Sequence, residues 1–179
     1  MNRKIFLLVV ALLTTFSASA YDLLVGGIYY NKFWNPDRQQ YDATVTCGVI
    51  KYSGDITIPS SVINSSNRYR VTDIGVDAFR DCTELNSVTI PEIIVNQGAF
   101  RGCTGLTAIY GPYATEDNRC WISSGVLLAF APAGLTEFAI PDGVTSIGKY
   151  VFYNCTDLQT ISIPEGVTEI GAYAFAGCT

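Results

Sequence analysis

The sequence contains no histidine, and this absence excludes a large part of catalytic chemistry. Ser-His-Asp and Cys-His nucleophile systems, histidine general bases and every metal site with an imidazole ligand are impossible. Charged residues are scarce at 15%, and sixteen acidic against eleven basic residues argue against a nucleic-acid-binding surface. There is also no Cys-x-x-Cys pair, no Gly-x-Ser-x-Gly elbow and no glycine-rich phosphate loop. We therefore expect no enzyme, no catalytic residue, no cofactor and no metal site.

The first twenty residues have the three parts of a secretory signal peptide. Arg3 and Lys4 precede an apolar run from Ile5 to Leu13, and small residues follow at positions 18–20. This run is too short to span a bilayer, and no later stretch approaches the roughly 18 apolar residues that a span requires. Cleavage before Tyr21 would leave nine basic and sixteen acidic residues. We expect an exported protein without a membrane span, located at the cell surface, in the periplasm or in the medium.

The remainder of the chain contains an internal repeat. Residues 141–156 align with residues 164–179 at a constant offset of 23, and the same frame is present over 71–91 and 98–109. The frame is lost over the irregular stretch 111–125 and resumes at Leu135. A period of about 20 to 29 residues with one short strand per unit is typical of solenoids built from leucine-rich repeats.

Each repeat unit has two apolar segments with different roles. Apolar and polar residues alternate over 161–163, as in a half-buried strand, and a proline then ends the strand. A shorter apolar pair, a glycine turn, an inward phenylalanine and a cysteine complete the coil. We expect the phenylalanines at this phase to stack as a spine inside the solenoid: Phe79, Phe100, Phe152 and Phe175.

The repeated pattern is Val-Thr-x-Ile-Gly-x-x-Ala-Phe-x-x-Cys-x-x-Leu-x-x-Ile-x-Ile-Pro, and it resembles the BspA-type (Treponema pallidum-type) leucine-rich repeats of bacterial surface proteins. The segments 27–30, 52–59 and 69–72 resemble the N-terminal part of such proteins from Bacteroides-like bacteria. The resemblance implies a β-rich α/β solenoid of short strands, turns and short helical or 3-10 segments. It also implies a cell-surface or secreted protein, in some cases an adhesin for host matrix proteins, and offers no catalytic residues.

The expected organisation has three parts. Residues 1–20 form the signal peptide, residues 21–70 a β-rich N-terminal cap, and residues 71–179 the repeats with the irregular island at 111–125. The sequence stops where a further strand would begin, so the last coil is expected to expose apolar surface unless something covers it.

The six cysteines would ordinarily suggest disulfides in an exported protein. Four of them share one phase of the repeat, three residues after the inward phenylalanine: Cys82, Cys103, Cys155 and Cys178. A small buried thiol is a normal core residue at such a position, and we expect free thiols there. Cys47 and Cys120 lie outside this phase, and a bridge between them stays open.

The residues that alternate with the buried ones in each strand should form an outward ladder. This predicted strand face is regular and laterally extended, which suits a docking surface, although Ser and Thr are also ordinary β-surface residues. Tyr110 and the nearby Tyr113 are the expected aromatic anchors. The candidate partner-binding residues are Asp55, Thr57, Ser87, Thr89, Tyr110, Tyr113, Glu137, Thr160 and Ser162.

These patterns favour a non-catalytic exported protein that recognises or adheres to a protein or glycan partner through its strand face. The resemblance makes a host matrix protein one such partner. The alternative is a structural or accessory envelope protein that self-associates or assembles with another chain through its open C-terminal coil.

Overall fold

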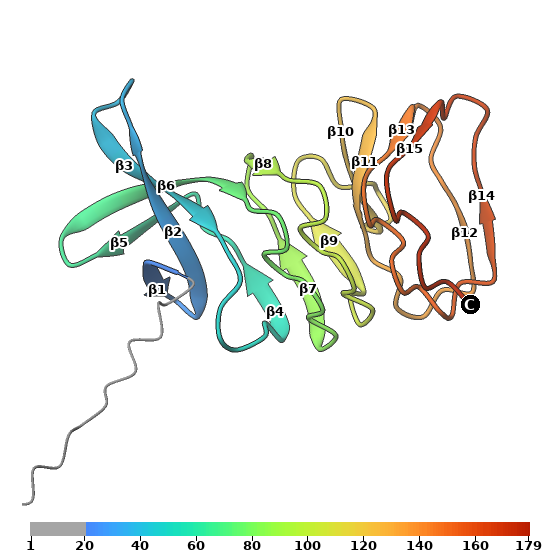
Figure 1. The fold of residues 1–179 in the computed structure, drawn as a ribbon, viewed down its shortest axis with the longest axis horizontal. Coiled ribbons are helices and arrows are strands. Elements are labelled where there is room, and N and C mark those ends of the chain that lie inside the picture. Colours follow the sequence, from blue (N-terminus) through green and yellow to red (C-terminus); the bar gives the residue numbers. More distant parts are fainter. Residues whose placement is uncertain (1–20) are drawn as a thin grey trace, which may run out of the picture.

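The computed structural model describes residues 21–179, so the expected signal peptide lies outside the described residues. These residues form an elongated row of stacked coils, with the N-terminal sheet at one end and the last repeats at the other (Figure 1). The strands are β1 (Leu23–Val25), β2 (Ile28–Asn35), β3 (Gln40–Val45), β4 (Gly54–Thr57), β5 (Ser61–Asn64), β6 (Asn67–Ile74), β7 (Leu85–Thr89), β8 (Ile94–Val95), β9 (Ala108–Tyr110), β10 (Cys120–Ser123), β11 (Val126–Phe130), β12 (Glu137–Ala139), β13 (Ser146–Ile147), β14 (Thr160–Ser162) and β15 (Glu169–Ile170).

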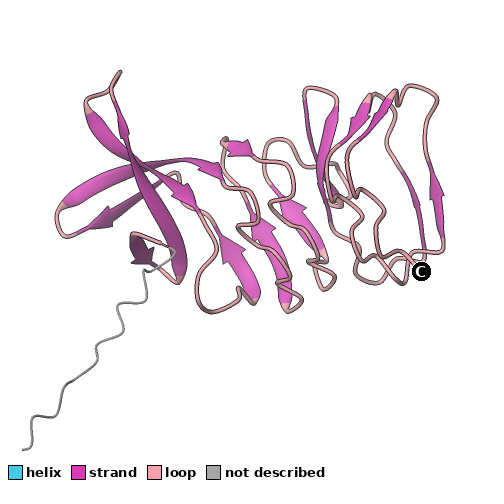
Figure 2. Ribbon diagram, in the orientation of Figure 1, coloured by secondary structure: helices cyan, strands magenta, loops and turns pink. Residues whose placement is uncertain are grey.

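Short strands joined by turns and loops make up all of residues 21–179 (Figure 2). The short helical or 3-10 segments expected from the resemblance are turns in this part of the chain. None of the described residues forms a helix long and apolar enough to cross a membrane. The solenoid and its β-rich character are therefore confirmed, and the turns replace the helical segments because each coil reverses over too few residues.

The N-terminal sheet has the strand order β1-β2-β3-β6-β5, and β8 also pairs with β6. Antiparallel hairpins give way to parallel pairing where β3 meets β6 and β6 meets β8. Such parallel pairing between successive coils is the solenoid pattern, so this sheet closes the end of the molecule and also starts the repeats. It thereby covers an end of the stack that would otherwise expose unpaired strand edges.

Two kinds of parallel ladder run along the repeats. The first contains the alternating strands, in a three-stranded sheet β4-β7-β9 and a two-stranded sheet β12-β14. The second is the parallel ladder β11-β13-β15, in which β13 and β15 are two residues long, and β10 adds to it at the β11 edge. Of this group, β10 and β11 form an antiparallel hairpin, which is the structure adopted by the island's second half.

Two left-handed residues, four positions apart, bracket the inward phenylalanine of each coil. They are Asp77 and Asp81, Gly98 and Gly102, Tyr150 and Asn154, and Tyr173 and Gly177, with φ between 54° and 80°. Glycine adopts this region without steric cost, whereas Tyr150 and Tyr173 adopt it against their side-chain preference. The resulting sharp turn sends the phenylalanine inward and lets the Phe79 amide donate to the Ala99 carbonyl of the next coil at 2.8 Å.

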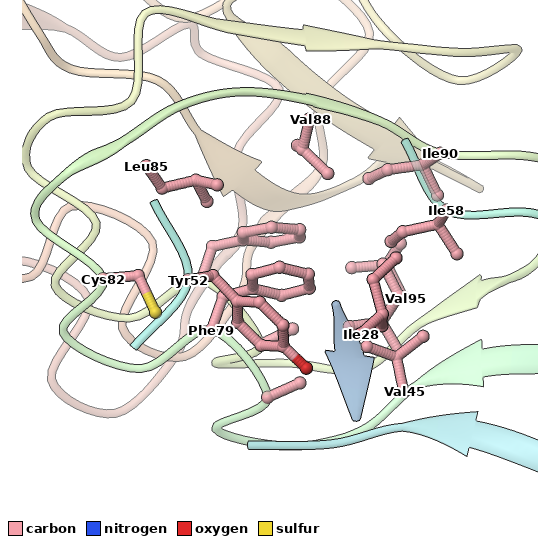
Figure 3. Packing of buried hydrophobic residues seen from close by; sticks show 14 of the residues in the cluster. Ile28, Val45, Tyr52, Ile58, Phe79, Cys82, Leu85, Val88, Ile90 and Val95 are labelled. Carbon is pink, nitrogen blue, oxygen red and sulfur yellow. The ribbon is translucent and has the colours of Figure 1, made fainter. Parts of the chain in front are cut away.

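The aromatic spine consists of two stacks. Phe79 and Phe100 stack with ring centroids 4.8 Å apart, and Phe152 and Phe175 stack at 4.9 Å. Tyr52 extends the first stack and Phe130 extends the second. In Figure 3 the rings of Tyr52 and Phe79 lie together in the core, with Leu85 and Val88 of β7 beside them. The four expected phenylalanines thus point inward, but in two groups that belong to different core clusters.

All six cysteines are free. The Cys103 thiol donates to the Phe79 carbonyl at 2.9 Å, and the Cys178 thiol donates to the Phe152 carbonyl at 2.9 Å, so each thiol links its own coil to the preceding one. Burial raises the pKa of Cys155 to about 12. Cys47 is exposed and Cys120 is buried, and the two are not bridged.

Candidate binding surfaces

The outward residues of β4, β7 and β9 lie in register and form one continuous surface. Asp55 pairs with Ser87 and Ser87 with Ala108, while Thr57 pairs with Thr89 and Thr89 with Tyr110. The inward neighbours Val88 and Ile109 are fully buried, which fixes the direction of the outward side chains. The sequence-predicted ladder is therefore present over these three strands.

The electrostatics of this surface centre on Asp55. Its Oδ1 accepts hydrogen bonds from the Ser87 hydroxyl and the Asn86 side-chain amide, each at 2.6 Å. These two donors hold the pKa of the Asp55 carboxyl below its usual value. The carboxylate thus fixes the side chains of the next coil, and the surface presents ordered polar groups rather than free rotamers.

The ladder resumes only at β12 and β14, where Glu137 pairs with Thr160 and Ala139 with Ser162. Between the two blocks the chain follows the island instead. The Ile109 amide donates to the Asn118 carbonyl at 2.7 Å, and the Ala133 amide donates to the Leu106 carbonyl at 3.0 Å. Glu137, Thr160 and Ser162 are exposed as expected, but they form a second surface that is not hydrogen-bonded to the first.

The two candidate anchors are placed on different surfaces. Tyr110 is 42% exposed at the end of β9, on the strand face. Tyr113 instead packs edge-on against Trp121 of β10, with ring centroids 5.5 Å apart, and its hydroxyl lies 3.4 Å from Glu92 Oε1. The turn at Gly111 separates them, because its backbone passes close to the Ile90 carbonyl and the Trp121 ring, where a Cβ would not fit.

Tyr113 borders a groove that the sequence did not indicate, here called the lateral groove, of about 600 Å³. It lies between the turn of the β2–β3 hairpin, strands β6 and β8, and the β10–β11 hairpin. Figure 1 shows that these elements share one side of the molecule. The lining residues are Asn35, Asp37, Arg38, Arg70, Thr72, Glu92, Ile93, Ile94, Val95, Tyr113, Trp121, Ser123 and Leu128. The signal that could have located it is the excess length between Cys103 and Cys155, since inserted chain must leave the ladder.

Residues 21–179 contain no group of three or more Cys, Asp or Glu residues placed to hold a metal ion. The arrangement offers a regular polar face, a groove lined by both polar and apolar side chains, and an ordered core. These features suit recognition of another molecule.

The stacked coils, each with one short parallel strand, define a leucine-rich-repeat solenoid. The family model described as "BspA type Leucine rich repeat region" matches six copies over residues 55–118 and 128–179. The chain belongs to this family. The unmatched residues 119–127 contain β10 and the turn of its hairpin, where the repeat frame is lost.

Several solved structures are similar to this chain. A leucine-rich repeat protein from Bacteroides ovatus is 21% identical, with a TM-score of 0.52 and coverage of 88% of this chain and 45% of that one. A Treponema pallidum leucine-rich repeat protein is 26% identical, with a TM-score of 0.48 and coverage of 83% and 64%. A leucine-rich cell surface protein from Faecalibacterium prausnitzii is 23% identical, with a TM-score of 0.47 and coverage of 89% and 52%.

This chain therefore spans 45% to 64% of the length of these three proteins. Among curated proteins, none matches the chain.

Proposed function

We propose that this protein is a non-catalytic, exported recognition protein that binds a protein partner through the face formed by β4, β7 and β9. The main support for this proposal is the register of the three strands, which aligns Thr57, Thr89 and the exposed Tyr110 across three coils. The surface is regular and extends over three coils, which suits a macromolecule. The signal-peptide pattern of residues 1–20 and the resemblance of the repeats to those of bacterial surface proteins support export to the cell surface or the medium.

Tyr110 is the proposed anchor of the interface. It is an exposed aromatic side chain on a rigid strand, so it loses little conformational entropy when a partner covers it. A purified sample should bind saturably to one of a panel of immobilised host matrix proteins, measured by surface plasmon resonance. Tyr110→Ala should weaken that binding by about tenfold or more.

The matched control is Tyr41→Ala. Tyr41 is also about half exposed, but it lies on β3 at the far end of the molecule. Equal loss of binding in the two variants would contradict the assignment of the interface to β4, β7 and β9.

The second candidate function is assembly through the last coil. The exposed apolar side chains Ile163, Ile170 and Tyr173 of the last coil favour it, since exposed apolar surface can mark a contact. Concentration-dependent self-association in analytical ultracentrifugation, without any matrix protein present, would support assembly in place of recognition.

A further inference from the structure

The lateral groove exists because two sheets fail to join. Strand β8 pairs with β6 on one side only, and β10 pairs with β11, so no ladder connects β8 to β10. The β10–β11 hairpin joins the later coils, because β11 pairs in parallel with β13, but its other strand, β10, does not pair with β8. A volume of about 600 Å³ is thereby left open beside β8. This volume lies within the range of about 300 to 1,000 Å³ typical of ligand sites.

The charges that line the groove nearly cancel. The Arg38 guanidinium is paired with the buried Asp42 carboxylate, which also accepts a hydrogen bond from the Asn35 side chain at 2.7 Å. Within residues 21–179, neither Arg70 nor Glu92 takes part in an ion pair. The groove therefore presents one cation and carboxylates that are not ion-paired within residues 21–179, so it is complementary neither to a polyanion nor to a polycation. A neutral ligand with many hydroxyl groups can instead use both kinds of side chain as hydrogen-bond partners.

One wall of the groove is aromatic and rigid. Tyr113 is 38% exposed and packs at 74° against the buried Trp121, which holds its ring in place. The face of an aromatic ring is electron-rich and attracts the weakly positive C–H groups of an apolar ligand surface. A sugar ring presents such C–H groups on its faces and hydroxyl groups at its edge.

A peptide is less suited to this site. Peptides that add to a sheet edge bind through a run of main-chain hydrogen bonds. The edge available here is β8, which is only two residues long.

We propose that the lateral groove binds a neutral oligosaccharide, with Tyr113 stacking on a sugar ring and Arg70 and Glu92 hydrogen-bonding to its hydroxyl groups. This site is separate from the strand face. The inference holds whether or not that face binds a protein.

A glycan array carrying neutral and anionic oligosaccharides, together with unstructured peptides, tests the ligand class. Saturable binding to neutral oligosaccharides is the expected result. Preference for anionic glycans or for peptides would overturn the proposal, as would the absence of any binding to neutral oligosaccharides at millimolar concentration.

The residues are tested with the strongest neutral oligosaccharide from that array by isothermal titration calorimetry. Arg70→Ala and Tyr113→Ala should each weaken binding by about tenfold or more, because each removes a direct contact. Arg68→Ala is the matched control, since Arg68 is an exposed arginine on the same strand that does not line the groove. Tyr110→Ala should leave this affinity unchanged, which separates the groove from the strand face.

Trp121 provides an optical readout. The chain has two tryptophans, so Trp34→Phe leaves Trp121 as the single tryptophan. The oligosaccharide should shift its fluorescence with the same dissociation constant as calorimetry. Unchanged affinity in both Arg70→Ala and Tyr113→Ala, or an unchanged Trp121 spectrum on saturation, would overturn the assignment to the groove.

Discussion

At the scale of single residues, close contact between neighbouring coils limits which positions can carry a side chain. Gly105 follows Cys103 in its coil, and a Cβ at this position would lie 2.0 Å from the Thr83 carbonyl oxygen. The equivalent positions of other coils carry the acidic residues Glu84 and Asp157. Repeat alignment alone therefore suggests that Gly105 is replaceable, whereas the contact with the backbone of the preceding coil indicates that it is not.

Gly105→Ala should lower the free energy of unfolding by about 3 kcal/mol, because the backbone of two coils must separate to admit the methyl group. The control is Gly166→Ala, where the nearest atom to a Cβ is the Val144 carbonyl oxygen at 3.5 Å, an ordinary contact. Urea denaturation followed by circular dichroism measures both. Equal stabilities of the two variants would show that the coils are not in close contact at Gly105.

The buried thiols make stability sensitive to alkaline pH. The pKa of Cys155 is raised by burial from 9.0 to about 12, so the folded state keeps this thiol protonated where the unfolded chain ionises. The stability that this buried, protonated thiol contributes to the folded state is complete below about pH 9 and is lost as the pH rises toward 12. We expect the free energy of unfolding to fall across this window, and to fall less steeply in Cys155→Ala.

Cys47→Ala is the control for the alkaline measurement, because Cys47 is exposed. Burial also raises the pKa of Tyr30 to about 12, so the free energy of unfolding still falls with rising pH in every variant. The same slope in Cys155→Ala and the wild type would contradict the assignment of a buried neutral thiol at position 155.

At the scale of the repeat elements, the core depends on ring stacking between coils. Phe152 is fully buried between Phe130 and Phe175, with ring centroids 4.8 and 4.9 Å away. Phe152→Ala should lower the free energy of unfolding by about 3 to 5 kcal/mol, because it leaves a cavity in the middle of a stack. The exposed Phe33 provides the comparison, and Phe33→Ala should change stability by only about 0.5 kcal/mol. Equal melting temperatures of Phe152→Ala and Phe33→Ala would contradict the placement of Phe152 in a buried ring stack.

The repeat phase made much of the fold predictable. Strands β7, β9, β12 and β14 follow the alternating segments of the pattern, and the inward phenylalanines and the cysteine positions follow from the constant offset. The sequence also indicates that Phe130 points inward, since Ala129-Phe130 repeats the Ala-Phe pair found in other coils. The pair Ser124-Gly125 likewise indicates the turn of the β10–β11 hairpin. Both residues have positive φ, as in a two-residue type I′ hairpin turn.

The parts that sequence could not supply depend on packing between distant segments. The division of the strand face into two blocks arises because the island backbone bonds to Ile109 and leaves β9 without a partner in the next coil. Proximity in sequence predicts that Tyr113 lies beside Tyr110. The turn at Gly111 places it against Trp121 in the lateral groove instead.

At the scale of the whole molecule, the described chain offers three separate surfaces. The β4-β7-β9 face is regular and polar, the lateral groove is concave with an aromatic wall, and the last coil exposes apolar side chains. Regular stacking provides the strand face, and the inserted island provides the groove. A single irregular unit in a repeat array thus interrupts the strand ladder and adds a second kind of surface.

The proposed function requires the β4-β7-β9 face to contact a protein partner. Amide hydrogen exchange, measured with and without the matrix protein that binds in the panel, tests it most directly. Protection should concentrate in residues 54–57, 85–89 and 108–110, and should be absent from residues 160–170. Protection confined to the last coil, or to the segments that line the lateral groove, would contradict it.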